Sequence, residues 1–407
     1  GPPLPVPVLV SGIAAELTAA LFARDKARVV AGLEALVGLE SDAQRVRCME
    51  EGAGVVAREA LAGFADDVEV ARAACGALAN LAEAADNAVP LVRDGAHVAV
   101  IAAARTHGGD VEVARDACGA LQDMAAAADN LLSLMRDGAH TAVMAAARDH
   151  AGDVEVVRYA CGALANLAYV ADNGVPLVRD GAHTAVMAAA RAHAGDVAVA
   201  RDACGTLWRL SVAVDNWVPL FRDGAHTAVM AAARAHSGDM EVARYVCSAL
   251  QSLACPPENK AVLVRGGAHV TVMVAARAHA GDVVVARAAC AALNNLSLVA
   301  DNCVPLARDG AHTAVMAAAR VHSGDVEVAR AACRALQNLV AAADNRVPLV
   351  RDGAHQQAPV TTSEQRHGSR PSRFAADDVG VRRHLSKPQA RRQHDGGAAQ
   401  LVPLRQH

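Results

Sequence analysis

The sequence predicts an all-α fold, a right-handed α-solenoid of three-helix repeats that are 43 residues long. The tripeptide Gly-Ala-His recurs every 43 residues without insertion or deletion, and self-similarity at a fixed period is the signature of a repeat array. Residues 138–180 and 181–223 are identical at 30 of 43 aligned positions. Hydrophobic residues make up 53% of the chain and aromatic residues only 2%, so Ala, Val and Leu must fill a core of closely packed helices. The glycines of the tripeptide are Gly95, Gly138, Gly181, Gly224, Gly267, Gly310 and Gly353.

The first helix of a repeat is short, as residues 86–128 illustrate. Asp86 and Asn87 are predicted to form its N-cap pair. Pro90 is predicted to fall in its first turn, where the missing N–H costs little. The helix is expected to end just before Gly95, since glycine favours the left-handed conformation that follows many helices.

The second and third helices of this repeat are longer and antiparallel. The second is expected from about 97 to 106, where Gly108 and Gly109 follow and break it. Asp110 is predicted to cap the third helix, with Glu112 in its first turn favourably placed for the helix dipole. The third helix should bury an apolar stripe spaced three or four residues apart. This stripe is Val113, Ala114, Ala117, Cys118, Leu121 and Met124.

The period divides the chain into three parts. Residues 1–51 are predicted to form a leader and a divergent N-terminal cap repeat, and residues 52–352 seven complete repeats. Residues 353–407 are predicted to be a broken repeat followed by a disordered tail, because they lack a sustained apolar period. Residues 356–407 carry nine Lys and Arg against four Asp and Glu, so the tail is basic. Either a regulatory tail or a shift of reading frame at codon 356 would explain the break.

The repeats resemble the armadillo family. Leu78-Ala79-Asn80-Leu81-Ala82 and Leu164-Ala165-Asn166-Leu167-Ala168 match its third-helix motif, and the resemblance covers residues 52–352. HEAT repeats of similar length are the alternative. The resemblance implies that the third helices line a concave groove that binds extended peptides or partner proteins. The importin-α subclass is disfavoured, because no Trp remains at the positions of its Trp–Asn ladder.

We predict a candidate binding site where residues of the third-helix face differ between repeats. Six of the nine aromatic residues fall between residues 159 and 245, and binding energy at interfaces concentrates in Tyr, Trp and Arg. Drift of duplicated copies, with aromatics filling gaps, is the competing explanation. The predicted partner-binding groove residues are Tyr159, Asn166, Tyr169, Arg201, Trp208, Arg209, Tyr245 and Arg287.

One arginine recurs at the same position of every third helix. A groove lined with guanidinium groups would suit an acidic peptide. In most repeats, however, a Glu lies three residues earlier, where it would form a local ion pair. Ala198 and Val284 replace that Glu, which predicts that Arg201 and Arg287 are free to bind. The series is Arg72, Arg115, Arg158, Arg201, Arg244, Arg287 and Arg330.

Cysteines and histidines also recur with the repeat. Equivalent positions in stacked helices lie about 8–10 Å apart, too far for a disulfide, so the cysteines are predicted to be small buried thiols. Reduced thiols favour a cytoplasmic protein, with the nucleus as an alternative. The histidine series that begin at His97 and His107 converge on no single point, so no metal site is expected. The first series should pack at helix starts and the second should complement helix C-termini.

No catalytic motif occurs, so we expect neither an enzyme nor a cofactor. The formal net charge of −4 leaves no electrostatic footprint for nucleic acid, and no apolar stretch predicts a membrane span. The expected function is a non-enzymatic scaffold that binds a protein or peptide segment, which an acidic sequence would suit. A structural component of the cytoskeleton or cilium is the alternative.

Overall fold

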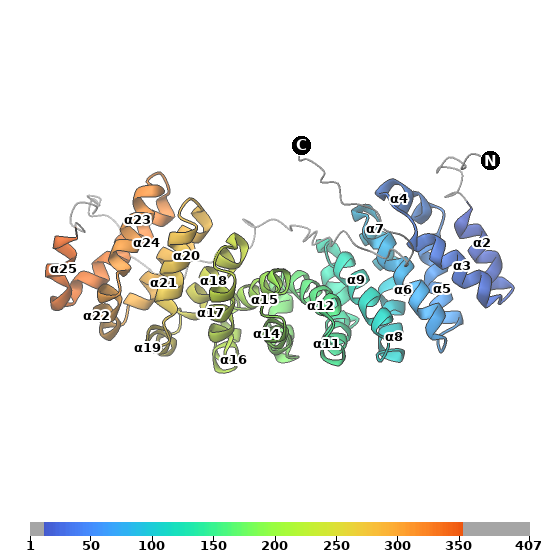
Figure 1. Cartoon of the computed structure of the whole chain (residues 1–407), viewed down its shortest axis with the longest axis horizontal. Coiled ribbons are helices and arrows are strands. Elements are labelled where there is room, and N and C mark those ends of the chain that lie inside the picture. The colour runs from blue at the N-terminus through green and yellow to red at the C-terminus, as the bar shows by residue number, and fades with distance from the viewer. Residues whose placement is uncertain (1–11, 353–407) are drawn as a thin grey trace, which may run out of the picture.

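The computed structural model describes residues 12–352, which form one elongated array of helices (Figure 1). Successive repeats stack side by side, and the third helices of neighbouring repeats pack against one another along the whole array. The predicted all-α solenoid is therefore confirmed. The predicted disordered tail lies outside the described residues, and the division into three parts stays a prediction.

Each repeat contributes one helix of each kind. The first helices are α4 (Asp42–Glu50), α7 (Ala85–Arg93), α10 (Leu131–Arg136), α13 (Ala171–Arg179), α16 (Trp217–Arg222), α19 (Pro257–Arg265), α22 (Ala300–Arg308) and α25 (Arg346–Arg351). The second helices are α2 (Ile13–Phe22), α5 (Ala53–Gly63), α8 (Ala96–Thr106), α11 (Ala139–Asp149), α14 (Ala182–Ala192), α17 (Ala225–Ala235), α20 (Ala268–Ala278) and α23 (Ala311–Val321). The third helices are α3 (Lys26–Val37), α6 (Val68–Ala82), α9 (Val111–Met124), α12 (Val154–Leu167), α15 (Val197–Leu210), α18 (Met240–Leu253), α21 (Val283–Ser297) and α24 (Val326–Ala341). Short 3-10 turns precede three of the first helices, at η1 (Ala128–Asn130), η2 (Val214–Asn216) and η3 (Ala343–Asn345).

The start of the first helix differs from the prediction. Helix α7 begins at Ala85, so Asn87 lies inside it and Pro90 lies beyond its first turn. Asn87 is buried, and its side-chain amide donates to the carbonyl oxygen of Leu81 at 2.9 Å. That carbonyl belongs to the last turn of α6, where the helix leaves its acceptors unsatisfied. The Asn therefore joins the end of the third helix to the next first helix, and the predicted N-cap pair is wrong.

The glycine between the first and second helices has the expected conformation. Gly95 has a φ of +80° and directly precedes α8, and the equivalent glycines from Gly52 to Gly310 have φ between +81° and +92°. Residues with a Cβ are strained in this region. The recurring glycine thus allows the sharp turn between two helices in every repeat.

Asp110 caps the third helix as predicted. Its carboxylate accepts hydrogen bonds from the backbone N–H groups of Glu112 and Val113, at 3.1 and 3.0 Å. Equivalent aspartates cap the other third helices from Asp25 to Asp325. Each fixes where its helix begins, and hence the register in which neighbouring third helices stack.

The core is a continuous layer of Ala, Val, Leu and Cys that runs between the second and third helices. All ten cysteines are free thiols, and all except Cys255 and Cys333 are buried. Burial raises the pKa of Cys118 to about 12, which keeps it protonated. The prediction of buried, reduced thiols is confirmed for the recurring cysteines except Cys333, which is partly exposed.

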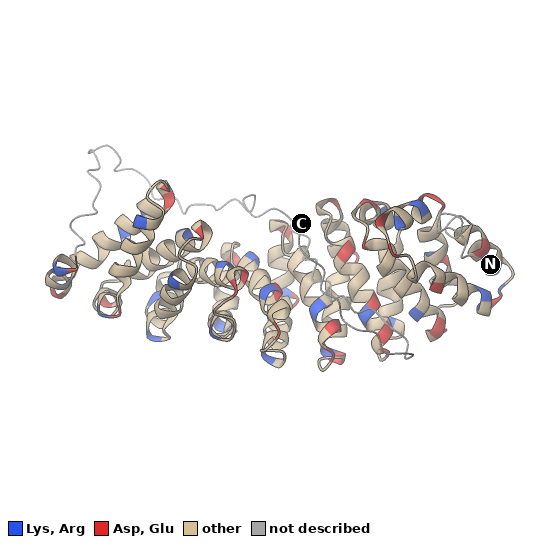
Figure 2. Ribbon diagram, turned by 45° about the horizontal axis from the view of Figure 1, so that its top comes forward, with Lys and Arg blue, Asp and Glu red and all other residues tan. Residues whose placement is uncertain are grey.

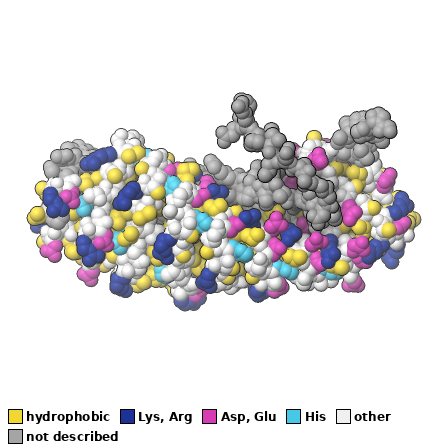
Figure 3. All heavy atoms as spheres, in the orientation of Figure 1, with side chains coloured by type: hydrophobic (Ala, Val, Ile, Leu, Met, Phe, Trp, Pro, Cys, Tyr) yellow, Lys and Arg dark blue, Asp and Glu magenta, His cyan; other side chains and the backbone are white. Residues whose placement is uncertain are grey.

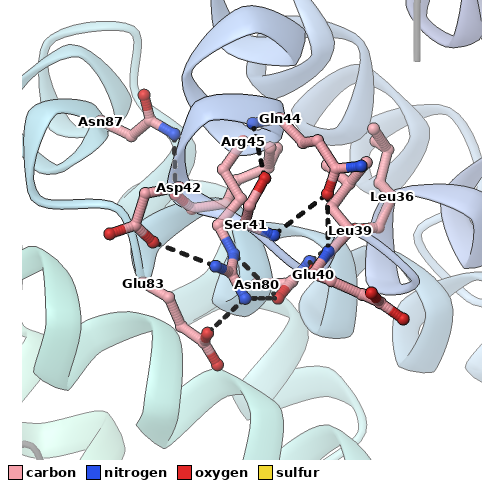
Figure 4. A network of polar contacts seen from close by, with 11 residues as sticks. Leu36, Leu39, Glu40, Ser41, Asp42, Gln44, Arg45, Asn80, Glu83 and Asn87 are labelled. Atoms are coloured by element: carbon pink, nitrogen blue, oxygen red, sulfur yellow. Dashed lines mark hydrogen bonds and ion pairs between the residues drawn. The ribbon is translucent and has the colours of Figure 1, made fainter. Parts of the chain in front are cut away.

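A buried arginine locks the first junction of the array (Figure 4). Arg45 of α4 is 6% exposed, and its guanidinium donates to the side-chain oxygen of Asn80 at 2.9 Å and to Glu83 at 2.6 Å. The amide of Asn80 in turn donates to the carbonyl oxygens of Leu36 and Leu39. This network ties α3, α4 and α6 together, and its paired charge offsets the cost of burying a guanidinium.

Within residues 12–352, no single helix is long and apolar enough to cross a membrane. Helices α19 and α20 meet such a criterion of length and composition only together, as a pair bent by 73°. In the array α20 packs against α17, α18, α21 and α23.

Candidate functional site on the third-helix face

The recurring arginines of the third helices tie neighbouring repeats together. Arg72 of α6 lies 2.5 Å from the carboxylate of Asp110, and Arg115 of α9 lies 2.7 Å from that of Asp153. The same pair recurs 38 residues apart in each internal repeat. Its other members are Arg158–Asp196, Arg201–Asp239, Arg244–Asp282 and Arg287–Asp325. Each aspartate thus caps its own helix and also binds the arginine of the preceding repeat.

These ties correct the expectation that two of the arginines are unpaired, while their predicted role in partner binding stays a prediction. Arg201 and Arg287 were expected to be free because they lack a local Glu, yet both pair with the capping aspartate of the next repeat. The predicted local pair does form between Arg244 and Glu241 at 3.3 Å and between Arg330 and Glu327 at 2.5 Å. The constant spacing of 38 residues, visible in the sequence, was the signal that would have identified the true partners.

A second tie uses the histidine at the start of the second helix. His97 is 4% exposed, and its Nε2 lies 2.9 Å from the carboxylate of Asp137 in the next repeat. Arg136 binds the same carboxylate, and the hydrogen bonds from Arg136 and then His97 hold the pKa of Asp137 at about 2. The predicted packing role of this histidine is confirmed. Its hydrogen-bond partner is the aspartate of the recurring Arg-Asp-Gly sequence.

The second histidine series also links repeats. Nε2 of His107 lies 2.8 Å from the carbonyl oxygen of Ala65, and that of His150 lies 2.7 Å from the carbonyl oxygen of Gly108. These histidines sit at the C-terminal ends of second helices, but each binds the loop of the preceding repeat rather than its own helix end. Histidines appear as separate spots along the body (Figure 3). Residues 12–352 contain no group of three His, Cys, Asp or Glu that could hold a metal ion.

The aromatic departures gather around one arginine. The guanidinium carbon of Arg209 lies 6.0 Å from the ring centre of Tyr169, 5.5 Å from that of Trp208 and 5.7 Å from that of Tyr245. Trp208 and Tyr245 stack at 5.7 Å between ring centres. Cation–π contacts of this kind attract a guanidinium to the faces of aromatic rings. We call Tyr169, Trp208, Arg209 and Tyr245 the Arg209 cluster.

The members of the Arg209 cluster differ in exposure. Tyr245 is only 5% exposed, so it packs against the ring of Trp208 and offers little surface to a partner. Tyr169, Trp208 and Arg209 are partly exposed. The Nη1 atom of Arg209 is buried and forms no hydrogen bond with the described chain. The exposed part of the cluster is therefore an aromatic surface with a cation at its centre.

A carboxyl group that the sequence did not single out lies beneath this cluster. Asp202 of α15 is 5% exposed, and its burial raises its pKa to about 7, against the opposing charges of Arg209 and Arg201. An acid at a position occupied by Tyr159 and Tyr245 in neighbouring repeats was the available signal. Asp202 therefore titrates near neutrality, and the charge of Arg209, the arginine among the aromatic rings, acts on it.

The other predicted residues have structural contacts. The side-chain amide of Asn166 donates to the carbonyl oxygen of Gln122 in the preceding repeat at 3.1 Å. Tyr159 is partly buried and lies over Gly119, where an added Cβ would come within 3.8 Å of its ring. Both residues therefore hold the stack together, and whether either binds a partner stays a prediction.

The junction between His226 and the next repeat lacks the histidine tie. Gly266 stands where the other repeats have aspartate, so His226 has no carboxylate 40 residues on. His226 instead stacks on Phe221 with 4.3 Å between ring centres, and burial lowers its pKa. This junction lies between α17 and α20.

The charges of the described residues are spread along the array. Basic and acidic segments alternate from end to end (Figure 2), as the repeated Arg–Asp ties require. No single face of the ribbon in this view collects one sign of charge.

Comparisons with known proteins agree with this architecture. The family model "LRRK2 ARM repeat" matches residues 17–214. A structure from work on a phosphorylation switch that controls the interaction between cadherin and beta-catenin has a TM-score of 0.71 at 14% identity, covering 82% of this chain and 66% of that one. A crystal structure of an engineered protein has a TM-score of 0.51 at 20% identity, covering 60% of this chain and 96% of that one. A search of curated proteins finds no match.

The repeat motif, the stacked three-helix units and the family match over residues 17–214 together show that the array is similar to armadillo repeats. The expected resemblance is therefore confirmed. Armadillo arrays typically act as protein-interaction scaffolds.

Proposed function

We propose that the chain is a non-enzymatic scaffold that binds a segment of a partner protein on its third-helix face, at the Arg209 cluster. The observation that carries this proposal is the cluster itself. Six aromatic residues depart from the repeat between residues 159 and 245, and three of them surround a single guanidinium. Aromatic residues and arginine dominate the binding energy of protein interfaces.

The cluster also suggests what the segment contains. The recurring arginines from Arg72 to Arg287 are paired with aspartates, so an acidic preference at the cluster would rest on Arg209. Its guanidinium would bind a carboxylate or carbonyl oxygen of the segment, while Trp208 and Tyr169 would cover an apolar side chain. The ten free thiols support a reducing compartment, so the proposal places the chain in the cytoplasm or the nucleus.

A peptide selection tests the proposal. A phage-displayed library of random peptides, roughly 16 residues long to suit an extended segment, would be selected on the intact protein. Binding of the selected peptides would then be measured by fluorescence anisotropy. Trp208→Ala and Tyr169→Ala should each weaken binding about tenfold or more, because truncated hot-spot aromatics cost at least about 1–2 kcal/mol.

Phe22→Ala is the matched control, because Phe22 is an aromatic residue that is 95% exposed on α2, far from the cluster along the chain. It should leave peptide affinity unchanged. Selected peptides that bind the Trp208 and Tyr169 variants as tightly as the parent protein would contradict the proposal.

A further inference from the structure

A cysteine and a buried lysine lie next to each other between α18 and α19. Cys255 follows the end of α18 and is partly exposed, whereas Lys260 of α19 is only 5% exposed. The Nζ atom of Lys260 donates a hydrogen bond to the carbonyl oxygen of Cys255 at 2.8 Å. Four covalent bonds join that oxygen to the Sγ atom of the same residue, a span of about 3–5 Å. Rotation of the flexible lysine stem can therefore bring Nζ against the sulfur.

This pair is a departure from the repeat. A cysteine and a lysine occupy these two positions together in this unit alone. Cys255 stands where the unit two repeats earlier has Tyr169, so it belongs to the variable positions of the array. The contact between the two residues lies within one unit, and it is therefore none of the recurring ties between repeats. At the same two positions the preceding unit has Val212 and Trp217, and the following unit has Leu298 and Cys303.

Both side chains are nucleophiles once they have lost a proton. Burial lowers the pKa of Lys260, so more of its amine is neutral than in an exposed lysine. Burial raises the pKa of Cys255, and the charge of Lys260 opposes that rise. The side-chain amide of Asn295 lies 3.6 Å from the Sγ atom of Cys255, and a hydrogen bond donated to the sulfur favours its thiolate. Because Cys255 is the more exposed of the two nucleophiles, a reagent from solvent meets the cysteine before the lysine.

We propose that Cys255 and Lys260 form a site of lysine acylation, at which the cysteine takes an acyl group from a small acyl thioester and passes it to the lysine. The burial of Lys260 shields its amine from direct attack on a donor in solvent. Delivery through the neighbouring sulfur avoids this obstacle, because the acyl group then arrives on the side where Nζ already lies. The acylated lysine loses its positive charge.

The transfer takes place in two steps. The thiolate of Cys255 attacks the carbonyl carbon of the donor, a new C–S bond forms, and the donor thiol leaves as a thiolate that takes up a proton from water. The neutral amine of Lys260 then attacks the same carbon, an amide C–N bond forms, and the C–S bond to Cys255 breaks. The nitrogen gives up a proton to the departing sulfur, which returns Cys255 as a thiol. A thioester and an amine have become an amide and a free thiol, with no change of oxidation state.

A small acetyl thioester, S-acetyl-N-acetylcysteamine, is the probe for this site. The intact protein would be incubated with it, and acetylation of the lysines would be followed over time by peptide mass spectrometry. Lys26 is the internal reference, because its side chain is 42% exposed and pairs with Asp67 and Glu69 at 2.7 and 2.8 Å. These two carboxylates raise the pKa of Lys26. Lys260 should be acetylated about tenfold faster than Lys26 or more, because intramolecular delivery raises the effective concentration of the acyl group.

Variants separate transfer through the cysteine from direct acylation. Cys255→Ser should slow the acetylation of Lys260 about tenfold or more and leave that of Lys26 unchanged. Lys260→Arg removes the acceptor, so the acetyl group should accumulate on Cys255 as a thioester that hydroxylamine cleaves. Cys333→Ser, which removes the other partly exposed thiol, is the matched control and should acetylate Lys260 at the rate of the parent. Circular dichroism verifies that each variant is folded.

Loss of Lys260 acetylation in Cys255→Ser, together with a thioester on Cys255 in Lys260→Arg, supports the site. Acetylation of Lys260 at an undiminished rate in Cys255→Ser would show direct acylation and overturn it. A thioester that forms on Cys255 of the parent but does not move to Lys260, or a parent in which neither residue is acetylated, would also overturn it. These measurements need no partner protein, so their result is separate from that of the peptide selection.

Discussion

The carboxylate of Asp153 does two things at once: it caps α12 through the backbone N–H groups of Glu155 and Val156, and it binds Arg115 of the preceding repeat at 2.7 Å. Asp153→Ala should therefore lower the local stability by about 2 kcal/mol, which is more than the loss of the cap alone would cost. Asp153→Asn keeps an oxygen acceptor for the cap and should cost about half as much. Hydrogen exchange of the first-turn amides of α12 measures the stability loss in both variants. Equal losses in Asp153→Ala and Asp153→Asn would show that the ion pair with Arg115 adds no stability.

The ties also predict how stability responds to acid. Although burial alone would raise its pKa, the net pKa of Asp153 is lowered by its backbone hydrogen bonds and by Arg115. A carboxylate with a lowered pKa in the folded state contributes stability above its unfolded pKa of about 3.9, and this is lost as pH falls through the folded pKa. The melting temperature of the parent should therefore drop steeply below about pH 4. Asp153→Asn should show a smaller drop, and an identical acid profile would contradict the tie.

Asp202 should have the opposite pH dependence. Its pKa is raised to about 7, so the folded state holds a proton that the unfolded state releases, and stability falls as pH rises between about 4 and 7. Asp202→Asn should be more stable than the parent at pH 8 by about 1–3 kcal/mol and nearly equal at pH 4. Thermal unfolding at the two pH values measures this. Asp116→Asn, at the equivalent position two repeats earlier, is the control and should lack the gain at pH 8.

Restoring the missing histidine tie should stiffen its junction. Gly266 has φ −76° and ψ −4°, close to the φ −84° and ψ 4° of Asp94 at the same position, so Gly266→Asp needs no change of backbone conformation. Its Cβ would lie 3.3 Å from the carbonyl oxygen of Val262, which must shift slightly. The new carboxylate should raise the pKa of His226, which burial now lowers. A raised histidine pKa adds stability below about pH 6.5 that is lost as pH rises through the folded pKa. Histidine titration by NMR tests this, with Gly266→Asn as the neutral control.

Thiol reactivity should follow burial. Cys255 and Cys333 are partly exposed, whereas the remaining eight cysteines are buried. Only the thiolate reacts readily, and burial raises the pKa of Cys118 to about 12. Brief treatment of the native protein with N-ethylmaleimide should therefore modify Cys255 and Cys333 first, as read by peptide mass spectrometry. Modification of Cys118 at the same rate would show that the array opens far more readily than its packing implies.

The fold could be predicted from the sequence because its strongest signals are local. Gly95 marks a left-handed turn and Asp110 marks a helix start, and both depend on a few neighbouring residues. The site was harder, because its contacts cross from one repeat to the next. Arg201 seemed free when only its own helix was considered, since its partner Asp239 lies 38 residues away. Tyr245 and Asp202 likewise required the packing between α15 and α18 to show how deeply they are buried.

The recurring tie has a consequence for how such a chain can change length. Excision of residues 116–158 would join Arg115 to Tyr159 and leave Asp196 as the next capping aspartate, again 38 positions along. Duplication of the same 43 residues would insert one more matched pair without disturbing the others. The array therefore tolerates the gain or loss of whole units by recombination between near-identical copies, while a change of even a few residues within a unit would separate an arginine from its aspartate.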